Sequence, residues 1–108
     1  MLFRSGKQDY DKAIKCYEKA IELNPNLAEA YTNLGDAYQE GRQDYDKAIK
    51  CYEKAIKLNP NLAIAYNNMG VAYQEQGNEK KAIECVKKAA RLGYEDAQRW
   101  LREKNISW

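Results

Sequence analysis

The sequence predicts an all-α fold, built as a solenoid of antiparallel helix pairs, and three observations lead to it. A 34-residue unit occurs twice, at residues 8–41 and 43–76, with only six differences, and a looser third copy begins at Asn78. Each unit carries two stretches whose apolar residues recur at steps of three and four, which is helical spacing. No segment alternates between apolar and polar residues with period two, so no strands are expected.

Length and composition fit one folded domain. The chain has 108 residues, of which 44% are hydrophobic and 31% charged, so it is too apolar for a disordered protein. We therefore assign residues 1–108 to a single domain. No stretch approaches the roughly 18 apolar residues of a membrane span. The start of the chain is too short for a secretory signal. Together these features predict a cytoplasmic protein without membrane contact.

The first predicted helix, over residues 9–23, follows a short segment that resembles the end of another helix. Residues 2–6 align with residues 37–41, at the end of the first helix of the next copy. Helix 9–23 is therefore predicted to be the unpaired second helix of a truncated repeat. Its apolar face would then be half covered, and it includes Ala13, Tyr17 and Ala20. Two interpretations stay open, a frayed monomeric end or head-to-tail self-stacking through this helix.

Two complete helix pairs are predicted next. Helices 26–40 and 44–58 form a repeat over residues 26–58, and helices 61–76 and 79–91 form another over residues 61–91. Pro25 and Pro60 end the preceding helices, because the residue before a proline is pushed out of the α region. Three polar side chains are predicted to cap the helices that follow them, namely Asp9, Asp44 and Asn78.

Small and aromatic residues recur at fixed places, and their pattern resembles the tetratricopeptide-repeat (TPR) family. The first copy reads Tyr31, Leu34-Gly35, Tyr38, Ala48, Tyr52, Ala55, Pro60, and the second reads Tyr66, Met69-Gly70, Tyr73, Ala82, Val86, Ala89. The small residues let a neighbouring helix approach closely. The resemblance covers about residues 8–92 and implies a right-handed TPR superhelix that binds other proteins.

The end of the chain is predicted to form a capping helix over residues 95–104. Gly93 can adopt the left-handed conformation that ends the preceding helix. Ala97 and Leu101 lie on one face of the capping helix. The segment around Tyr94 resembles the helix starts of the related Sel-type repeats, which supports its assignment as a cap that seals the last pair.

The resemblance assigns a concave groove to the first helix of each repeat. The groove stripe on helix 26–40 is Glu29, Thr32, Asn33, Asp36, Gln39 and Glu40. The matching stripe on helix 61–76 is Ile64, Asn67, Asn68, Val71, Gln74 and Glu75. These two helices carry four carboxylates and no Lys or Arg, whereas the chain as a whole has a net charge of +2. The groove is therefore predicted to be acidic, with the basic residues gathered on the second helices.

Two substitutions between the copies give the groove an apolar spot. Ile64 and Val71 are seven residues apart, two turns along one face, and they replace Glu29 and Asp36 of the first copy. The predicted partner is a neutral or basic peptide or helix segment with an apolar anchor. An alternative stays open, in which the capping helix covers Ile64 and Val71.

The best-known partner of the family, the acidic tail of heat-shock chaperones, is not predicted for this chain. Gripping that tail needs Lys and Arg on the groove helices. The corresponding slots hold Glu29 or Ile64, Thr32 or Asn67, and Asp36 or Val71, and only Asn33 and Asn68 match. The groove helices thus lack the cations that would hold a carboxylate.

Catalysis and cofactor binding are not expected. The chain has no histidine, which removes the commonest general base and metal ligand. Equivalent cysteines in successive repeats would be too far apart for one metal site, and these are Cys16, Cys51 and Cys85. The lysine runs lack interleaved aromatic residues, so no nucleic acid is predicted. We therefore predict a protein that is not an enzyme and needs no cofactor or metal.

A second interpretation is a structural or self-assembling repeat module. The two copies agree even at solvent positions such as Lys12 and Lys47, which packing does not dictate. Such agreement favours recent duplication, an engineered array or a piece of a larger repeat protein. Concentration-dependent growth into polymers would support this interpretation over the binding of a separate partner.

Overall fold

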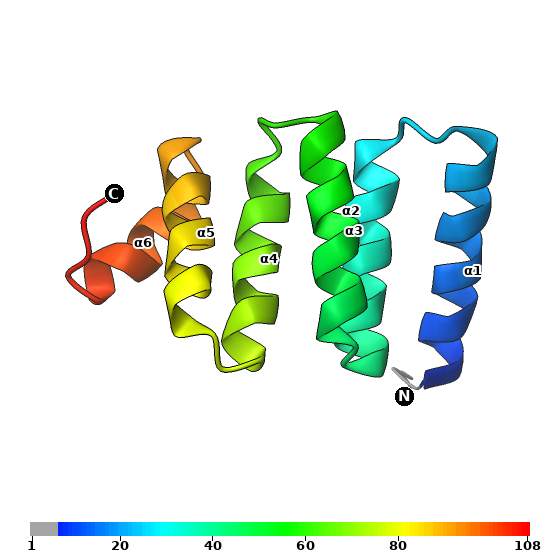
Figure 1. Ribbon diagram of the computed structural model, residues 1–108, viewed down its shortest axis with the longest axis horizontal. Helices are drawn as coiled ribbons and strands as arrows, with labels where there is room; N and C mark the ends of the chain where they lie inside the picture. Colours follow the sequence, from blue (N-terminus) through cyan, green and yellow to red (C-terminus); the bar gives the residue numbers. More distant parts are fainter. Residues whose placement is uncertain (1–6) are drawn as a thin grey trace.

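The computed structural model describes residues 7–108, in which every regular element is a helix. The order is α1 (Lys7–Leu23), α2 (Ala28–Ala37), a short π-helix η1 (Tyr38–Arg42), α3 (Tyr45–Leu58), α4 (Ala63–Glu75), α5 (Glu79–Arg91) and α6 (Glu95–Glu103). The connections lie alternately at the top and at the bottom of the view, so α1 to α5 run antiparallel in succession, while α6 lies obliquely against α5 (Figure 1). This arrangement confirms the all-α solenoid of helix pairs, and the handedness of the superhelix stays a prediction.

The largest departure from the predicted helix bounds is at the end of the helix predicted over 26–40. Its α-helical part stops at Ala37, and the backbone continues as η1. The cause is the single extra residue that separates the first two copies. In the second repeat the Asn78 N–H donates to the Tyr73 carbonyl at 2.9 Å, and in the first the equivalent Asp44 N–H donates to the Tyr38 carbonyl at 3.0 Å. The π-helix therefore accommodates the extra residue, and the hydrogen bond between the equivalent residues is present in both repeats.

Two of the three predicted helix caps are confirmed. The side chain of Asp44 accepts a hydrogen bond from the backbone N–H of Lys47 at 3.2 Å, and that of Asn78 accepts one from Lys81 at 3.3 Å. The prediction for Asp9 is wrong, because α1 begins at Lys7 and Asp9 lies inside its first turn. The alignment of residues 2–6 with 37–41 falls outside the described residues.

Glycines set the close approach of paired helices, as the repeat pattern predicts. A Cβ added at Gly35 of α2 would lie 2.7 Å from the Tyr52 ring of α3, and one at Gly70 of α4 would lie 3.0 Å from Val86 of α5. Tyr52 is fully buried at the centre of the larger core cluster. The small residue on one helix thus makes room for a large side chain on its partner.

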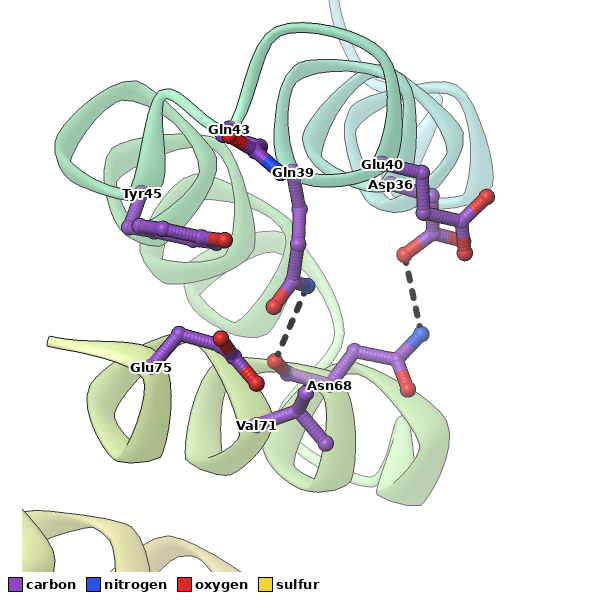
Figure 2. A pocket seen from close by; sticks show the side chains of 8 residues that line it. All are labelled: Asp36, Gln39, Glu40, Gln43, Tyr45, Asn68, Val71 and Glu75. Carbon is purple, nitrogen blue, oxygen red and sulfur yellow. Dashed lines mark hydrogen bonds between the residues drawn. The ribbon is translucent and has the colours of Figure 1, made fainter. Parts of the chain in front are cut away.

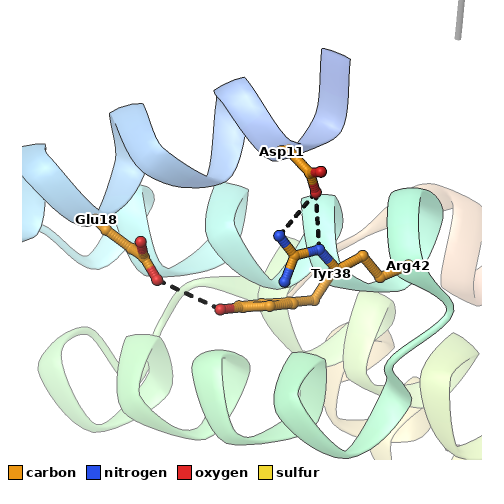
Figure 3. Close-up of polar contacts among 4 residues, drawn as sticks. All are labelled: Asp11, Glu18, Tyr38 and Arg42. Carbon is orange, nitrogen blue, oxygen red and sulfur yellow. Dashed lines mark hydrogen bonds and ion pairs between the residues drawn. The ribbon is translucent and has the colours of Figure 1, made fainter. Parts of the chain in front are cut away.

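Among residues 7–108, the helix α1 packs mainly against α2 and η1. Ile14 is buried against the core, but Ala13, Tyr17 and Ala20 are only partly buried, whereas their equivalents on α3 are fully buried. Arg42 donates two hydrogen bonds to the Asp11 carboxylate, at 2.9 and 2.7 Å, and also lies over the Tyr38 ring (Figure 3). The expectation of a half-covered apolar face on α1 is therefore confirmed for the described residues.

The last helix, α6, packs against α5. Ala97 and Leu101 are buried against the α5 residues Val86, Ala89 and Ala90. Gly93 has φ +97°, and the Tyr94 N–H donates to the Ala89 carbonyl at 3.0 Å, which completes the left-handed helix stop. Within residues 7–108, no helix combines the length and the apolar character needed to cross a membrane.

Candidate functional site

All twelve residues predicted for the groove line one of three adjoining hollows on the face formed by α2, α4 and α6. The first hollow has a volume of about 470 Å³ and lies between α2 and α4 (Figure 2). Its lining residues are Asp36, Gln39, Glu40, Gln43, Tyr45, Asn68, Val71 and Glu75. Carboxylates, amides and one valine thus share this space.

The other two hollows adjoin the first through shared residues. The second, of about 240 Å³, shares Asp36 with the first and is otherwise lined by Glu29, Thr32, Asn33, Leu62 and Ile64. The third, of about 180 Å³, shares Val71 with the first and is otherwise lined by Asn67, Gln74, Val86, Asp96 and Trp100. We call the three hollows together the groove.

A hydrogen-bond network holds the floor of the groove. The Asp36 carboxylate accepts from the Tyr52 hydroxyl at 2.5 Å and from the Asn68 amide at 2.9 Å. The Gln39 amide donates to the Tyr52 hydroxyl oxygen at 3.1 Å and to the Asn68 carbonyl at 3.4 Å. Because these residues come from α2, η1, α3 and α4, the network holds these four elements together around the first hollow.

Burial alters the acid–base chemistry of this network. Desolvation raises the pKa of Asp36, against the lowering effect of its hydrogen bonds from Tyr52 and Asn68. Desolvation, and then the hydrogen bond to Asp36, also raise the pKa of Tyr52, so this hydroxyl keeps its proton at neutral pH. Tyr52 therefore remains a donor to Asp36, and the network stays intact under ordinary conditions.

One acceptor in the groove has no partner among the described residues. The Gln39 side-chain oxygen is buried and receives no hydrogen bond. The Gln39 nitrogen is already committed to Tyr52 and Asn68, which fixes the orientation of the amide. The oxygen points into the first hollow (Figure 2). A buried acceptor left unpaired costs about 1–3 kcal/mol, so a donor in this hollow would be favoured to bond to it after a shift of the Gln39 side chain.

The two predicted apolar residues lie in different hollows. Val71 is 40% exposed and lines the first and third hollows, so α6 does not cover it. Ile64 is half-buried and lines the second hollow beside Leu62. The groove thus has two separate apolar places where the sequence suggested one.

Thr32 contributes to the groove differently from the other predicted residues. Its side chain is buried, with 5% exposed, and its hydroxyl donates to the Ala28 carbonyl one turn earlier at 3.2 Å. This local bond turns the hydroxyl back onto its own helix. Thr32 therefore forms part of the wall and presents no free donor to the second hollow.

Sequence reasoning missed five residues that line the first and third hollows. They are Gln43, Tyr45, Val86, Asp96 and Trp100. One signal for the third hollow was available, because Asp36 and Tyr52 of the first repeat, which bond to each other, are replaced together by Val71 and Val86 in the second. This paired change from polar to apolar marks where the groove becomes hydrophobic.

The charged side chains that line the groove are all acidic. Five carboxylates line the three hollows, from Glu29, Asp36, Glu40, Glu75 and Asp96, and none of the lining residues is Lys or Arg. Of these, Asp96 is paired with Arg99 at 2.7 Å, so most of the negative charge lies in the first and second hollows. A concave surface lined by charges of one sign attracts the opposite charge and repels its own. The lining therefore presents net negative charge to a group that enters the groove.

The described residues offer little for metal or thiol chemistry. Between residues 7 and 108 no three His, Cys, Asp or Glu side chains come together as metal ligands. Cys16 is exposed, Cys51 half-buried and Cys85 buried. Burial raises the pKa of Cys51 and of Cys85 to about 11, so both thiols stay protonated and weakly nucleophilic at neutral pH.

Comparisons with known proteins agree with the helix pairs and the repeat pattern. A sequence profile described as "TPR repeat" matches residues 6–40 and 42–77, and one described as "Tetratricopeptide repeat" matches residues 63–92. The crystal structure of MamA is similar, with 36% identity and a TM-score of 0.75 over 83% of this chain and 52% of the MamA chain. The matched part is therefore about half of MamA. Curated protein sequences gave no match. With most of its length matched by these profiles, the chain belongs to the tetratricopeptide-repeat family.

Proposed function

We propose that this chain is a non-catalytic scaffold that binds a peptide or helix segment of another protein in the groove. TPR repeats and the similarity to MamA support a protein-interaction scaffold in general. The observation that carries the finer proposal is the continuity of the three hollows, which join five carboxylates to the exposed Val71 and other, partly buried apolar side chains and have no Lys or Arg in their lining. The partner segment is accordingly neutral or basic and carries an apolar anchor. An acidic chaperone tail would meet like charge throughout the groove.

Replacing Val71 with aspartate is expected to weaken partner binding by at least about 10-fold. Val71 lines both the first and the third hollow, so replacing it removes apolar contact with the partner. The new carboxylate would also have to lose water when the partner binds. The side chain is 40% exposed, so helicity and stability should change little. Affinity for peptides selected from a random display library is measured by calorimetry, and folding by circular dichroism.

The matched control is Cys16→Asp, which places the same new charge at an exposed site on α1 outside the groove. This variant should bind as the parent does. Equal binding by Val71→Asp and the parent, with both folded, would remove this part of the groove from the binding surface. A library that yields no peptide at all would contradict the proposed function itself.

A self-assembling repeat module is the second candidate, and the open face of α1 favours it. Tyr10, Ala13 and Tyr17 line a further hollow of about 240 Å³ beside α2, and Leu23 at the end of α1 is 76% exposed. A second copy stacked head to tail would cover this face. Light scattering over a range of concentrations separates the candidates, because a strict monomer at high concentration is incompatible with self-stacking.

Several sequence-based predictions accompany the proposal. They are the division of the single domain 1–108 into an unpaired helix, two repeats and a cap, the cytoplasmic location, and the absence of nucleic-acid and membrane partners. Each stays a prediction beside the proposed scaffold function. Cell fractionation tests the cytoplasmic location and the absence of a membrane partner. Electrophoretic mobility shifts with duplex and single-stranded DNA test the absence of a nucleic-acid partner.

A further inference from the structure

We propose that the groove recognises a lysine or arginine placed next to a large apolar side chain, with the cation in the first hollow and the apolar group in the third. This inference rests on the proposed function and names the chemistry of the segment that the groove selects. It follows from the different lining of the two hollows and from the residue that they share.

The first hollow is suited to a cation with hydrogen-bond donors. Glu40 and Glu75 face it from η1 and α4, both are exposed, and neither takes part in the network that holds the floor. Between them the free oxygen of Gln39 points into the same space. A lysine ammonium or an arginine guanidinium supplies positive charge to the carboxylates, and it supplies an N–H to this oxygen when the Gln39 side chain turns further into the hollow. A neutral apolar group would leave the buried oxygen unpaired.

The third hollow is suited to an apolar side chain. Val71, Val86 and Trp100 form its wall from α4, α5 and α6, and its volume of about 180 Å³ is enough for one large side chain. Val86 is buried, so the rigid core supports this wall. Asp96 also lines this hollow, is exposed, and accepts a hydrogen bond from the Arg99 guanidinium at 2.7 Å, so its charge is already paired. An aliphatic or aromatic group entering here loses water from three apolar neighbours at once.

Val71 determines how close the two partner side chains must be. It lines both hollows, so the cation and the apolar group would each contact this one side chain. A partner meets this requirement when the two residues are neighbours on one face, either adjacent turns of a helix or alternate positions of an extended segment. The recognised feature is therefore a basic–apolar pair, and overall positive charge alone does not provide it.

The test uses peptides selected from a random display library on the full chain. We expect the selected sequences to share a basic residue beside a large apolar one. Replacing that basic residue in the peptide by methionine, which keeps its length and removes its charge, should weaken binding about 10-fold. The loss should shrink at about 1 M salt, where the screening length is near 3 Å.

The protein side is tested with the double variant Glu40→Gln/Glu75→Gln. It should bind the parent peptide about 10-fold more weakly and should no longer distinguish that peptide from its methionine form. The control Glu53→Gln/Glu84→Gln changes the net charge equally at exposed sites on α3 and α5 outside the groove, and should keep the discrimination. Equal loss in both double variants would reveal a long-range charge effect and overturn the inference.

Failure of this inference differs from failure of the proposed function. Peptides that bind and are lost with Val71→Asp, but that lack a basic residue and ignore Glu40→Gln/Glu75→Gln, would overturn the basic–apolar pair and leave the groove standing. The absence of any peptide binding sensitive to Val71→Asp would overturn both.

Discussion

Replacing Tyr52 with alanine is expected to lower the free energy of unfolding by about 3–5 kcal/mol, the range found when a large aromatic side chain is removed from a core. Tyr52 is fully buried, and its ring packs against Gly35. The close approach of α2 and α3 at this point leaves no room for a Cβ beside the ring. Its loss also removes a donor to Asp36, and the Gln39 amide loses an acceptor. Urea denaturation followed by circular dichroism measures the change.

The repeat supplies a control at an identical position of the pattern. Tyr17 occupies the same slot as Tyr52 but is only partly buried, so Tyr17→Ala should cost less than half as much. The conservative variant Tyr52→Phe keeps the ring and removes one hydrogen bond, and should cost about 1–2 kcal/mol. Equal effects of Tyr17→Ala and Tyr52→Ala would mean that α1 is as completely covered as α3, contrary to the fold described above.

The second large effect is expected from Leu101→Ala, at about 2–5 kcal/mol of local stability. Leu101 is fully buried and joins α6 to Val86, Ala89 and Ala90. A nine-residue helix is too short to persist in water without such packing. The helix should therefore detach while the rest of the solenoid stays folded. Hydrogen exchange should show faster exchange of α6 amides and unchanged protection at the centre of α3.

Trp108→Ala is the control for the cap. Trp108 is 38% exposed and touches α6 through Arg102, whose guanidinium lies 5.9 Å from its ring centre. Exposed contacts of this kind contribute under about 1 kcal/mol. The exchange of α6 should barely change in this variant. If Leu101→Ala also left α6 fully protected, the buried contact would not be what holds the cap.

The helix pairs could be predicted because the same pattern of small and large residues occurs twice in the sequence. Gly35 and Gly70 stand at matching places, and each has a large partner side chain on the next helix. The π-helix at Tyr38–Arg42 could not be predicted, because a one-residue insertion can be placed in a loop or in a helix. The insertion lies in the helix because the hydrogen bond from the Asp44 N–H to the Tyr38 carbonyl is then preserved. That preference follows from the three-dimensional backbone geometry and cannot be read from the sequence.

The groove could be predicted from α2 and α4 but not from their neighbours. Helical periodicity places Asp36 on the groove side of α2 and Val71 on the groove side of α4, and both line the first hollow. Trp100 lines the groove because of the way in which α6 crosses α5, and helical periodicity does not predict how two helices cross. Thr32 fits the stripe by spacing, yet its hydroxyl bonds back to its own helix. Local bonding of this kind competes with the periodic pattern and is decided side chain by side chain.

Nuclear magnetic resonance of the labelled chain, titrated with one selected peptide, tests the central claim most directly. If the face of α2, α4 and α6 is the binding surface, the largest shifts will be at the backbone amides of Asp36 and Val71 and at the Gln39 side-chain amide. The outer faces of α3 and α5, reported by Lys54 and Lys87, should show no change. The largest shifts at Lys54 and Lys87, with Gln39 unmoved, would contradict the account.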